Sequence, residues 1–130
     1  MRWAFFASLV LFLAASRCLA DPPQIAPDQA REYVGQTVTV RGKVVDARWA
    51  PGLSGKPTIL CLDKPFGSKI FFVIIYQKDR SKFSFSPEKQ LKDRTIRVTG
   101  RVQIRGGTPE IVVTDPSQIG VEDLGTEDRG

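Results

Sequence analysis

The stretch TVTVRGKV, at Thr37–Val44, recurs almost unchanged as TIRVTGRV, at Thr95–Val102. In both copies apolar residues alternate with polar ones, which is the pattern of a β-strand with one face in a core. Each copy carries a glycine at its sixth position, Gly42 and Gly100. A glycine inside a strand is typical of a sharp bend or a bulge. The repeat therefore predicts two equivalent bent strands in one small barrel, the alternative being a chance likeness between two amphipathic strands.

The segments around the repeat complete an all-β pattern. Alternating or continuous apolar runs, separated by Gly- and Pro-containing turns, predict five strands and two short helices. The strands are Thr37–Asp46, Thr58–Asp63, Ile70–Tyr76, Thr95–Arg105 and Glu110–Thr114, and the helices are Pro27–Gly35 and Ser86–Leu91. A helix between the third and fourth of five strands is the order of the OB-fold, a small Greek-key barrel. We therefore expect a five-stranded barrel of this kind, with a short additional helix at its N-terminus.

The first 20 residues have the features of a secretory signal peptide. Met1-Arg2 supplies a positive charge, Trp3–Ala15 is almost wholly apolar, and small residues precede a cleavage point after Ala20. The apolar run is short of the roughly 20 residues that a membrane-spanning helix needs. We therefore expect a periplasmic or secreted protein without a stable membrane anchor. The expected organisation is a signal peptide (1–20), a flexible leader (21–26), an OB-fold domain (27–119) and an acidic disordered tail (120–130).

Charge is unevenly distributed along the chain. From Arg31 to Pro109 there are 16 Lys/Arg residues against six Asp/Glu, a charge of +10, whereas Glu110–Gly130 carries −5. A basic body favours polyanions such as nucleic acid, acidic polysaccharide or anionic lipid headgroups. The alternative is a solvated surface that serves only solubility. Beyond the signal peptide the chain keeps a single cysteine, Cys61, which lies in an apolar run and is expected to be a small buried hydrophobic residue.

Several segments resemble bacterial secreted or periplasmic OB-fold domains of the nucleic-acid-binding type. The segments are VGQTVTVRGKV at Val34–Val44, GKPTILCL at Gly55–Leu62, FFVIIYQKDRSKF at Phe71–Phe83, LKDRTIRVTGRV at Leu91–Val102 and PEIVVTDPSQI at Pro109–Ile119. The resemblance implies the barrel fold. It does not select a function, because domains of this kind occur in single-strand-binding proteins, anticodon-binding domains, secreted nucleases and stand-alone periplasmic proteins.

The sequence offers little for catalysis. It contains no histidine, the commonest general base and metal ligand, and no cluster of Cys, Asp and Glu has metal-ligand spacing. Secreted nucleases with this barrel need several carboxylates around a calcium ion, whereas Asp46, Asp63 and Asp79 are isolated in the sequence. We therefore expect no catalytic residues, no metal and no cofactor, and hence a protein that is not an enzyme.

Binding is the better-supported expectation. In this fold, oligonucleotides lie across the second and third strands, between the loops that follow strands one and four. Single-strand binding requires cations along the backbone path and aromatic faces for the bases. The residues of these types in the expected places are Arg48, Trp49, Lys56, Tyr76, Lys78, Arg80, Lys82 and Arg105. Each group also has a purely structural interpretation. Trp49 could fold back and cover one end of the barrel, and the charged run at residues 78–82 could be an ordinary solvated loop.

Three functional hypotheses follow from these residues. The first is a non-catalytic module that binds single-stranded nucleic acid or another polyanion. The second is a protein–protein interaction module of the cell envelope that uses the same barrel face. The third is a thermonuclease-like hydrolase, which would depend on Asp46, Asp63 or Asp79.

Overall fold

The computed structural model describes residues 21–122, and in it the two copies of the repeat are hydrogen-bonded neighbours. Strand β2 (Thr37–Trp49) pairs antiparallel with β5 (Thr95–Arg101), from Thr37 opposite Arg101 to Lys43 opposite Thr95. Val40 of the first copy lies opposite Val98, the equivalent residue of the second. The two copies are thus related by an approximate twofold axis at this pair, which explains why one strand pattern is used twice.

The repeated glycines allow close approach. Neither Gly42 nor Gly100 has a positive φ. A Cβ at Gly100 would lie 2.6 Å from the Ile111 side chain, and one at Gly42 would lie 2.9 Å from both Asp63 and Pro27. The expected bulge occurs nearby, since the register of β2 against β3 shifts between Val44 and Asp46.

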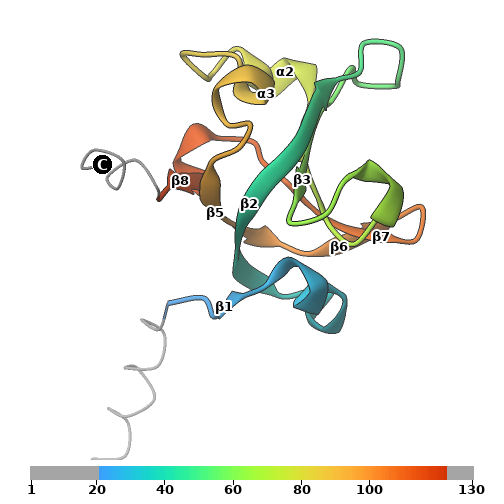
Figure 1. Cartoon of the computed structure of the whole chain (residues 1–130), viewed down its shortest axis with the longest axis vertical. Helices are drawn as coiled ribbons and strands as arrows, with labels where there is room; N and C mark the ends of the chain where they lie inside the picture. Colours follow the sequence, from blue (N-terminus) through green and yellow to red (C-terminus); the bar gives the residue numbers. More distant parts are fainter. Residues whose placement is uncertain (1–20, 123–130) are drawn as a thin grey trace, which may run out of the picture.

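Eight strands form one sheet (Figure 1). The other six are β1 (Gln24–Ile25), β3 (Thr58–Leu62), β4 (Phe72–Ile75), β6 (Gln103–Arg105), β7 (Thr108–Val112) and β8 (Ile119–Val121). The hydrogen-bonded order is β6-β7-β4-β3-β2-β5-β8, with β1 pairing parallel to β2. Pairing is antiparallel along this path except between β4 and β7, which are parallel.

The expectation of a closed barrel of five strands was wrong, because the sheet has eight strands and an open order. One cause is Val102, which divides the expected strand Thr95–Arg105 into β5 and β6. The backbone N–H of Val102 donates to the carbonyl of Gln36 (3.0 Å), and its carbonyl accepts from Gly35 N–H (2.8 Å). These bonds turn the chain so that β5 pairs with β2 while β6 pairs with β7. The all-β class itself is confirmed.

Two segments outside the expected domain core also join the sheet. Gln24–Ile25, in the expected flexible leader, forms β1 with Ile25 buried. Gly120 and Val121, in the expected tail, belong to β8, and Glu122 accepts hydrogen bonds from Arg41 and Arg97. The expected signal peptide at residues 1–20 and the part of the expected tail beyond Glu122 lie outside the described residues.

Short helices fill the connections. The 3-10 helix η3 (Pro27–Tyr33) stands where the sequence predicts a helix and has Pro27 at its first position. The expected helix between the third and fourth long strands is α3 (Pro87–Gln90), although Ser86 makes no side-chain cap. A further one-turn helix, α2 (Gln77–Arg80), directly follows β4. The remaining turns are η4 (Phe66–Ser68) and η5 (Pro116–Gln118).

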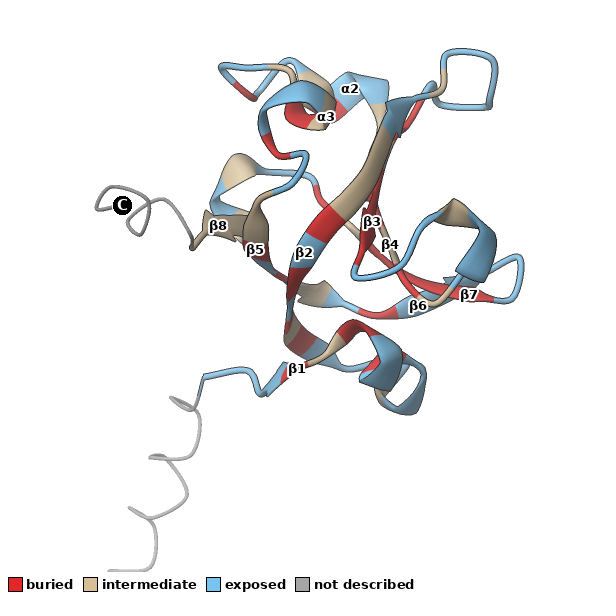
Figure 2. Ribbon diagram, viewed as in Figure 1, coloured by how far each residue is buried: buried red, intermediate tan, exposed pale blue. Residues whose placement is uncertain are grey.

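The core lies inside the curved sheet (Figure 2). It is aliphatic, with Phe71 as its largest fully buried side chain, and α3 brings Leu91 and the preceding loop brings Phe83 against one end. Among residues 21–122 no helix is long and apolar enough to cross a membrane.

Candidate functional site

The outer face of the sheet is defined by residues that lie opposite one another across neighbouring strands, since such residues share a face. One row crosses β2, β3, β4, β7 and β6 and consists of Asp46, Cys61, Phe72, Glu110 and Gln103. The next row consists of Arg48, Ile59, Ile74 and Val112. The core residues Leu60, Val73 and Ile111 occupy the other face. The outer face therefore has an apolar middle and polar residues toward its edges.

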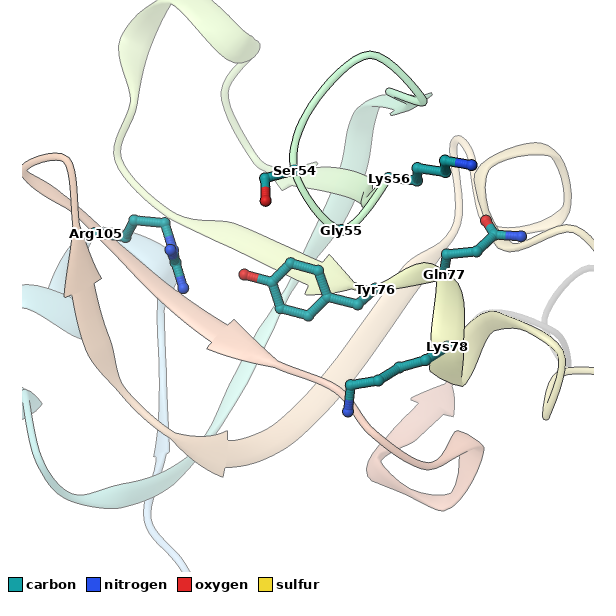
Figure 3. A pocket seen from close by; sticks show the side chains of 7 residues that line it. All are labelled: Ser54, Gly55, Lys56, Tyr76, Gln77, Lys78 and Arg105. Atoms are coloured by element: carbon teal, nitrogen blue, oxygen red, sulfur yellow. The ribbon is translucent and has the colours of Figure 1, made fainter.

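A cleft of about 670 Å³ opens at the end of β4. It is lined by Ser54, Gly55, Lys56, Tyr76, Gln77, Lys78 and Arg105 (Figure 3). These residues come from the loop between β2 and β3, from the junction of β4 with α2, and from the end of β6. The alternation of side chains along β4 places Tyr76 on the same face as Phe72 and Ile74. The cleft thus lies at one end of the outer face.

The loop between β2 and β3 is fixed against Tyr76. The backbone N–H of Gln77 donates to the carbonyl of Gly55 (3.0 Å), and Ala50 N–H donates to the carbonyl of Pro57 (2.8 Å). Gly55 has φ +81°, and a Cβ there would lie 2.6 Å from Cδ1 of Tyr76. Only glycine meets both requirements, so this loop packs directly on the Tyr76 ring and holds it in place.

On the opposite side of the cleft, Arg105 is bonded to a buried acid. Arg105 Nε donates to Oε2 of Glu110 (3.0 Å), and Gln103 Nε2 donates to the same oxygen (2.7 Å). Glu110 is 2% exposed, whereas the Arg105 side chain is 60% exposed. The hydrogen bond from Arg105 to Glu110, with the negative charge of that acid, raises the pKa of Arg105 above its ordinary value. Arg105 is therefore charged at neutral pH.

Four of the eight residues proposed from the sequence line the cleft together: Lys56, Tyr76, Lys78 and Arg105. Arg48 lies on the outer face but at its other edge, on β2. Its guanidinium carbon is 4.0 Å from the centre of the Phe66 ring, and the Phe66 ring packs against Phe72 with their centres 5.9 Å apart. In this structure Arg48 therefore holds the loop between β3 and β4 onto the sheet.

Trp49 and Arg80 lie together away from the cleft. Trp49 is 43% exposed, and the guanidinium of Arg80 stands 5.3 Å from its ring centre. Arg80 also makes two hydrogen bonds to the Glu88 carboxylate (2.7 and 3.0 Å) and one to the hydroxyl of Thr58. These bonds from Arg80 hold the pKa of Glu88 below its ordinary range. Arg80 thus links α2 to Glu88 of α3 and to Thr58 of β3 and contacts the partly exposed ring of Trp49, and neither residue lines the cleft.

Lys82, another of the eight proposed residues, is hydrogen-bonded within the fold and does not line the cleft. Its ammonium donates to Oδ1 of Asp79 (2.9 Å) and to the carbonyl of Thr114 (3.0 Å). Asp79 is 4% exposed, and Lys78 Nζ lies 3.5 Å from its other oxygen. The hydrogen bond from Lys82, against the opposing effect of burial, lowers the pKa of Asp79. Asp79 therefore pairs with one lysine at each of its two oxygens, and Lys82 links it to Thr114.

Sequence reasoning missed the residues that shape the cleft rather than supply its charge. The sequence places Gly55 only in a long loop, and it predicts Glu110 as the first residue of a strand that in fact begins at Thr108. Alternation gives no signal for Glu110, because its burial depends on pairing with Phe72 and Gln103. The double glycine at 106–107, which does signal a tight turn, correctly places Arg105 beside β7.

Asp46, Asp63 and Cys61 are each accounted for by contacts within the fold. Within residues 21–122 no group of three or more His, Cys, Asp or Glu side chains could hold a metal ion. Asp63 accepts from Lys43 N–H (2.9 Å), and Asp46 accepts from Phe66 N–H (3.4 Å). Burial, with a smaller effect of Asp46, raises the pKa of Cys61 to about 12. Its thiol is therefore protonated at neutral pH, which removes its nucleophilic form.

Comparison with known proteins supports the fold alone. No protein-family model matches the chain, and no curated protein does. Among solved structures, OBody AM3L09 bound to hen egg-white lysozyme superimposes with a TM-score of 0.53 and 18% identity, over 79% of this chain and 97% of that one. Aspartyl-tRNA synthetase from Entamoeba histolytica gives a TM-score of 0.46 and 22% identity, over 69% of this chain and 19% of that one. The chain spans about a fifth of the length of the aspartyl-tRNA synthetases that it matches. The chain therefore has an all-β, OB-like fold.

Proposed function

We propose that this protein is a non-catalytic binding module of the periplasm or the extracellular space, and that its ligand is single-stranded nucleic acid or another polyanion. The observation that carries the proposal is the cleft, whose lining combines three cations, Lys56, Lys78 and Arg105, with one aromatic residue, Tyr76. Cations along a backbone path and an aromatic face for a base are the two requirements of single-strand binding.

The position of the cleft supports the same proposal. It lies where the loop after β2, the end of β4 and the β6–β7 turn meet. In barrels of the OB type, the corresponding strands and loops are the usual place for oligonucleotides and oligosaccharides. The segment from Arg31 to Pro109, which contains every residue that lines the cleft, carries a formal charge of +10, and a basic body favours polyanions.

The proposal is tested by titrating a labelled single-stranded oligonucleotide with the purified protein and following fluorescence anisotropy at low and at moderate salt. We expect saturable binding that weakens with salt, because each phosphate contact releases condensed cations from the strand. A double variant of the cleft, Lys56→Gln with Lys78→Gln, should bind more weakly and with a shallower salt dependence. The matched control, Lys64→Gln with Lys89→Gln, removes the same charge from exposed lysines that do not line the cleft.

The outcome decides between the three hypotheses. Equal losses in the two double variants would mean that charge alone attracts the strand and that the cleft is not its site. No binding at low salt would reject the proposal and favour a protein partner in the cell envelope. Shortening of the labelled strand during incubation with Ca²⁺ or Mg²⁺ would contradict the non-catalytic part and return attention to Asp46, Asp63 and Asp79.

A further inference from the structure

Glu110 is an acid in a place that disfavours charge. It lies in the middle of β7, between its neighbours Phe72 on β4 and Gln103 on β6, and it is 2% exposed. Taking a carboxylate out of water costs several kcal/mol unless hydrogen bonds and an opposite charge compensate. Glu110 receives both from the two residues of β6 on its side of the sheet, Gln103 and Arg105.

The hydrogen bond to Glu110 uses only one of the N–H donors of Arg105. Glu110 accepts from the Nε of Arg105. A guanidinium has five N–H donors in a planar fork, and four of them belong to the two terminal nitrogens. Within residues 21–122, the Arg105 guanidinium has no hydrogen bond other than the one from Nε to Glu110. Glu110 thus fixes the Nε of Arg105 and leaves its two terminal nitrogens free to bind a ligand.

The aromatic ring of the cleft points toward Arg105. Figure 3 shows the hydroxyl end of Tyr76 pointing toward Arg105, while the side chains of Lys56 and Gln77 point away from it. Tyr76 is also one of the groups that raise the pKa of Arg105, after the hydrogen bond and the charge of Glu110. Gly55 packs on the Tyr76 ring from the loop side. Ring and guanidinium are therefore both held before any ligand arrives.

We propose that Glu110 is a positioning residue that keeps the terminal nitrogens of Arg105 free in the cleft beside Tyr76, so that the cleft recognises one nucleotide unit: a phosphate on Arg105 and a base against Tyr76. This inference rests on the proposed function and narrows it, because a polyanion without bases satisfies only half of the site. A fixed fork matches two phosphate oxygens at once, whereas the ammonium of Lys78 contributes charge without direction.

The test uses substitutions at Glu110, for which charge and geometry predict opposite results. If only net charge attracts the strand, removing the negative charge of Glu110 should tighten binding. If Glu110 positions Arg105, Glu110→Met should weaken binding of a labelled oligothymidylate about tenfold, the scale of one lost hydrogen bond to a charged group. Glu110→Gln retains an oxygen for Arg105 and Gln103 and should fall between Glu110→Met and the unchanged protein. Asp93→Asn, at an exposed acid outside the cleft, is the control for charge and should bind as tightly as the unchanged protein or slightly more tightly.

The nucleotide part of the inference is tested with an abasic oligonucleotide of equal length, which keeps the phosphates and lacks the bases. The unchanged protein should bind it about tenfold more weakly than oligothymidylate, since stacking on one aromatic ring contributes on that scale. Tyr76→Leu should remove this difference. Removing one member of an ion pair is strongly destabilising when the charge left behind is buried. The Arg105 side chain is 60% exposed, so water can solvate its charge in Glu110→Met. Thermal unfolding of Glu110→Met checks that the variant is folded, and Glu110→Gln, which keeps an acceptor for both partners, is the second variant.

The outcomes separate this inference from the proposed function. Weaker binding of Glu110→Met, partial recovery in Glu110→Gln and a preference for the strand with bases support both. Equal binding of the two strands, together with tighter binding by Glu110→Met, overturns the inference while leaving a polyanion-binding protein. Failure of the unchanged protein to bind either strand at low salt rejects the proposed function and the inference with it.

Discussion

At Gly100, the second glycine of the repeat, the core leaves no room for the Cβ that any other residue would add. It lies opposite Val38 in the β2–β5 pair, where its backbone approaches the core so closely that an added Cβ would lie 2.6 Å from Ile111. Ala at this position can adopt the backbone conformation, because φ is not positive. Any cost must therefore come from the overlap with the core.

We predict that Gly100→Ala lowers the free energy of unfolding by about 1 to 3 kcal/mol, the usual cost of forcing an extra methyl group into a packed core. Urea denaturation followed by circular dichroism measures the change. Gly52→Ala is the matched control, because nothing lies within 4 Å of its added Cβ. Because Gly→Ala lowers the entropy of the unfolded chain, Gly52→Ala should be neutral or slightly stabilising. An equal loss of stability in both variants would mean that the contact with Ile111 does not set the cost.

Cys61 gives a prediction about reactivity. Its side chain is fully buried in β3 and its pKa is raised to about 12, first by burial and then by Asp46. Since the thiolate is the reactive form, iodoacetamide at pH 8 should leave Cys61 unmodified in the folded protein and alkylate it in denaturant. Peptide mapping by mass spectrometry identifies the residue. Rapid alkylation without denaturant would show that the strand opens locally.

At the scale of the element, β8 depends on one carboxylate. Arg41 and Arg97 lie directly opposite each other on β2 and β5, an arrangement in which like charges destabilise a sheet. Glu122, at the end of β8, accepts from Arg41 Nε (2.8 and 2.9 Å) and from Arg97 Nη1 (2.7 Å). One acid thus relieves the repulsion and holds β8 against β5.

We expect Glu122→Gln to cost about 1 kcal/mol, at the upper end for exposed ion pairs because three charges are linked. The loss should be larger in dilute buffer than at 1 M salt, where the screening length is about 3 Å. Hydrogen exchange should quicken at the amides of Ile119 and Val121, which belong to β8. Faster exchange spread evenly over the whole sheet would instead indicate a general loss of stability.

At the scale of the whole molecule, alternation predicted the long strands because each has one face in the core. It could not predict β1 or β8, which are two- and three-residue strands stabilised only by their neighbours. The break at Val102 was equally hidden, since it results from bonds to Gly35 and Gln36, which lie far earlier in the chain.

The candidate site also contains residues that the sequence predicted and residues that it could not predict. Residue type and loop position were enough to propose Lys56, Tyr76, Lys78 and Arg105. They also selected Arg80, whose guanidinium is occupied by Glu88 and Thr58, because a sequence does not show which cations already have partners. The role of Glu110 depends on strand pairing and on burial, neither of which can be read from its neighbours in the chain.

The absence of histidine from the sequence determines how the stability of the whole protein depends on pH. With no imidazole to titrate, the free energy of unfolding should be nearly constant between about pH 5 and 8. The pKa values of Asp79, Glu88 and Asp115 are lowered by hydrogen bonds from Lys82, Arg80 and Ser117 respectively. A carboxyl group with a lowered pKa in the folded state stabilises the protein above its unfolded pKa, and this contribution is lost as the pH falls toward the folded value.

We therefore predict that the free energy of unfolding declines below about pH 4, the range in which unfolded carboxyl groups take up protons. Lys82→Met removes the largest cause of the lowered pKa of Asp79 and should cost about 1 kcal/mol at pH 7, since Lys82 is half exposed. Urea denaturation at a series of pH values should show the two proteins approaching each other in acid, where Asp79 becomes protonated in both. Curves that stay parallel from pH 7 to about 3 would mean that Lys82 acts through the Thr114 carbonyl, a bond that does not titrate in this range.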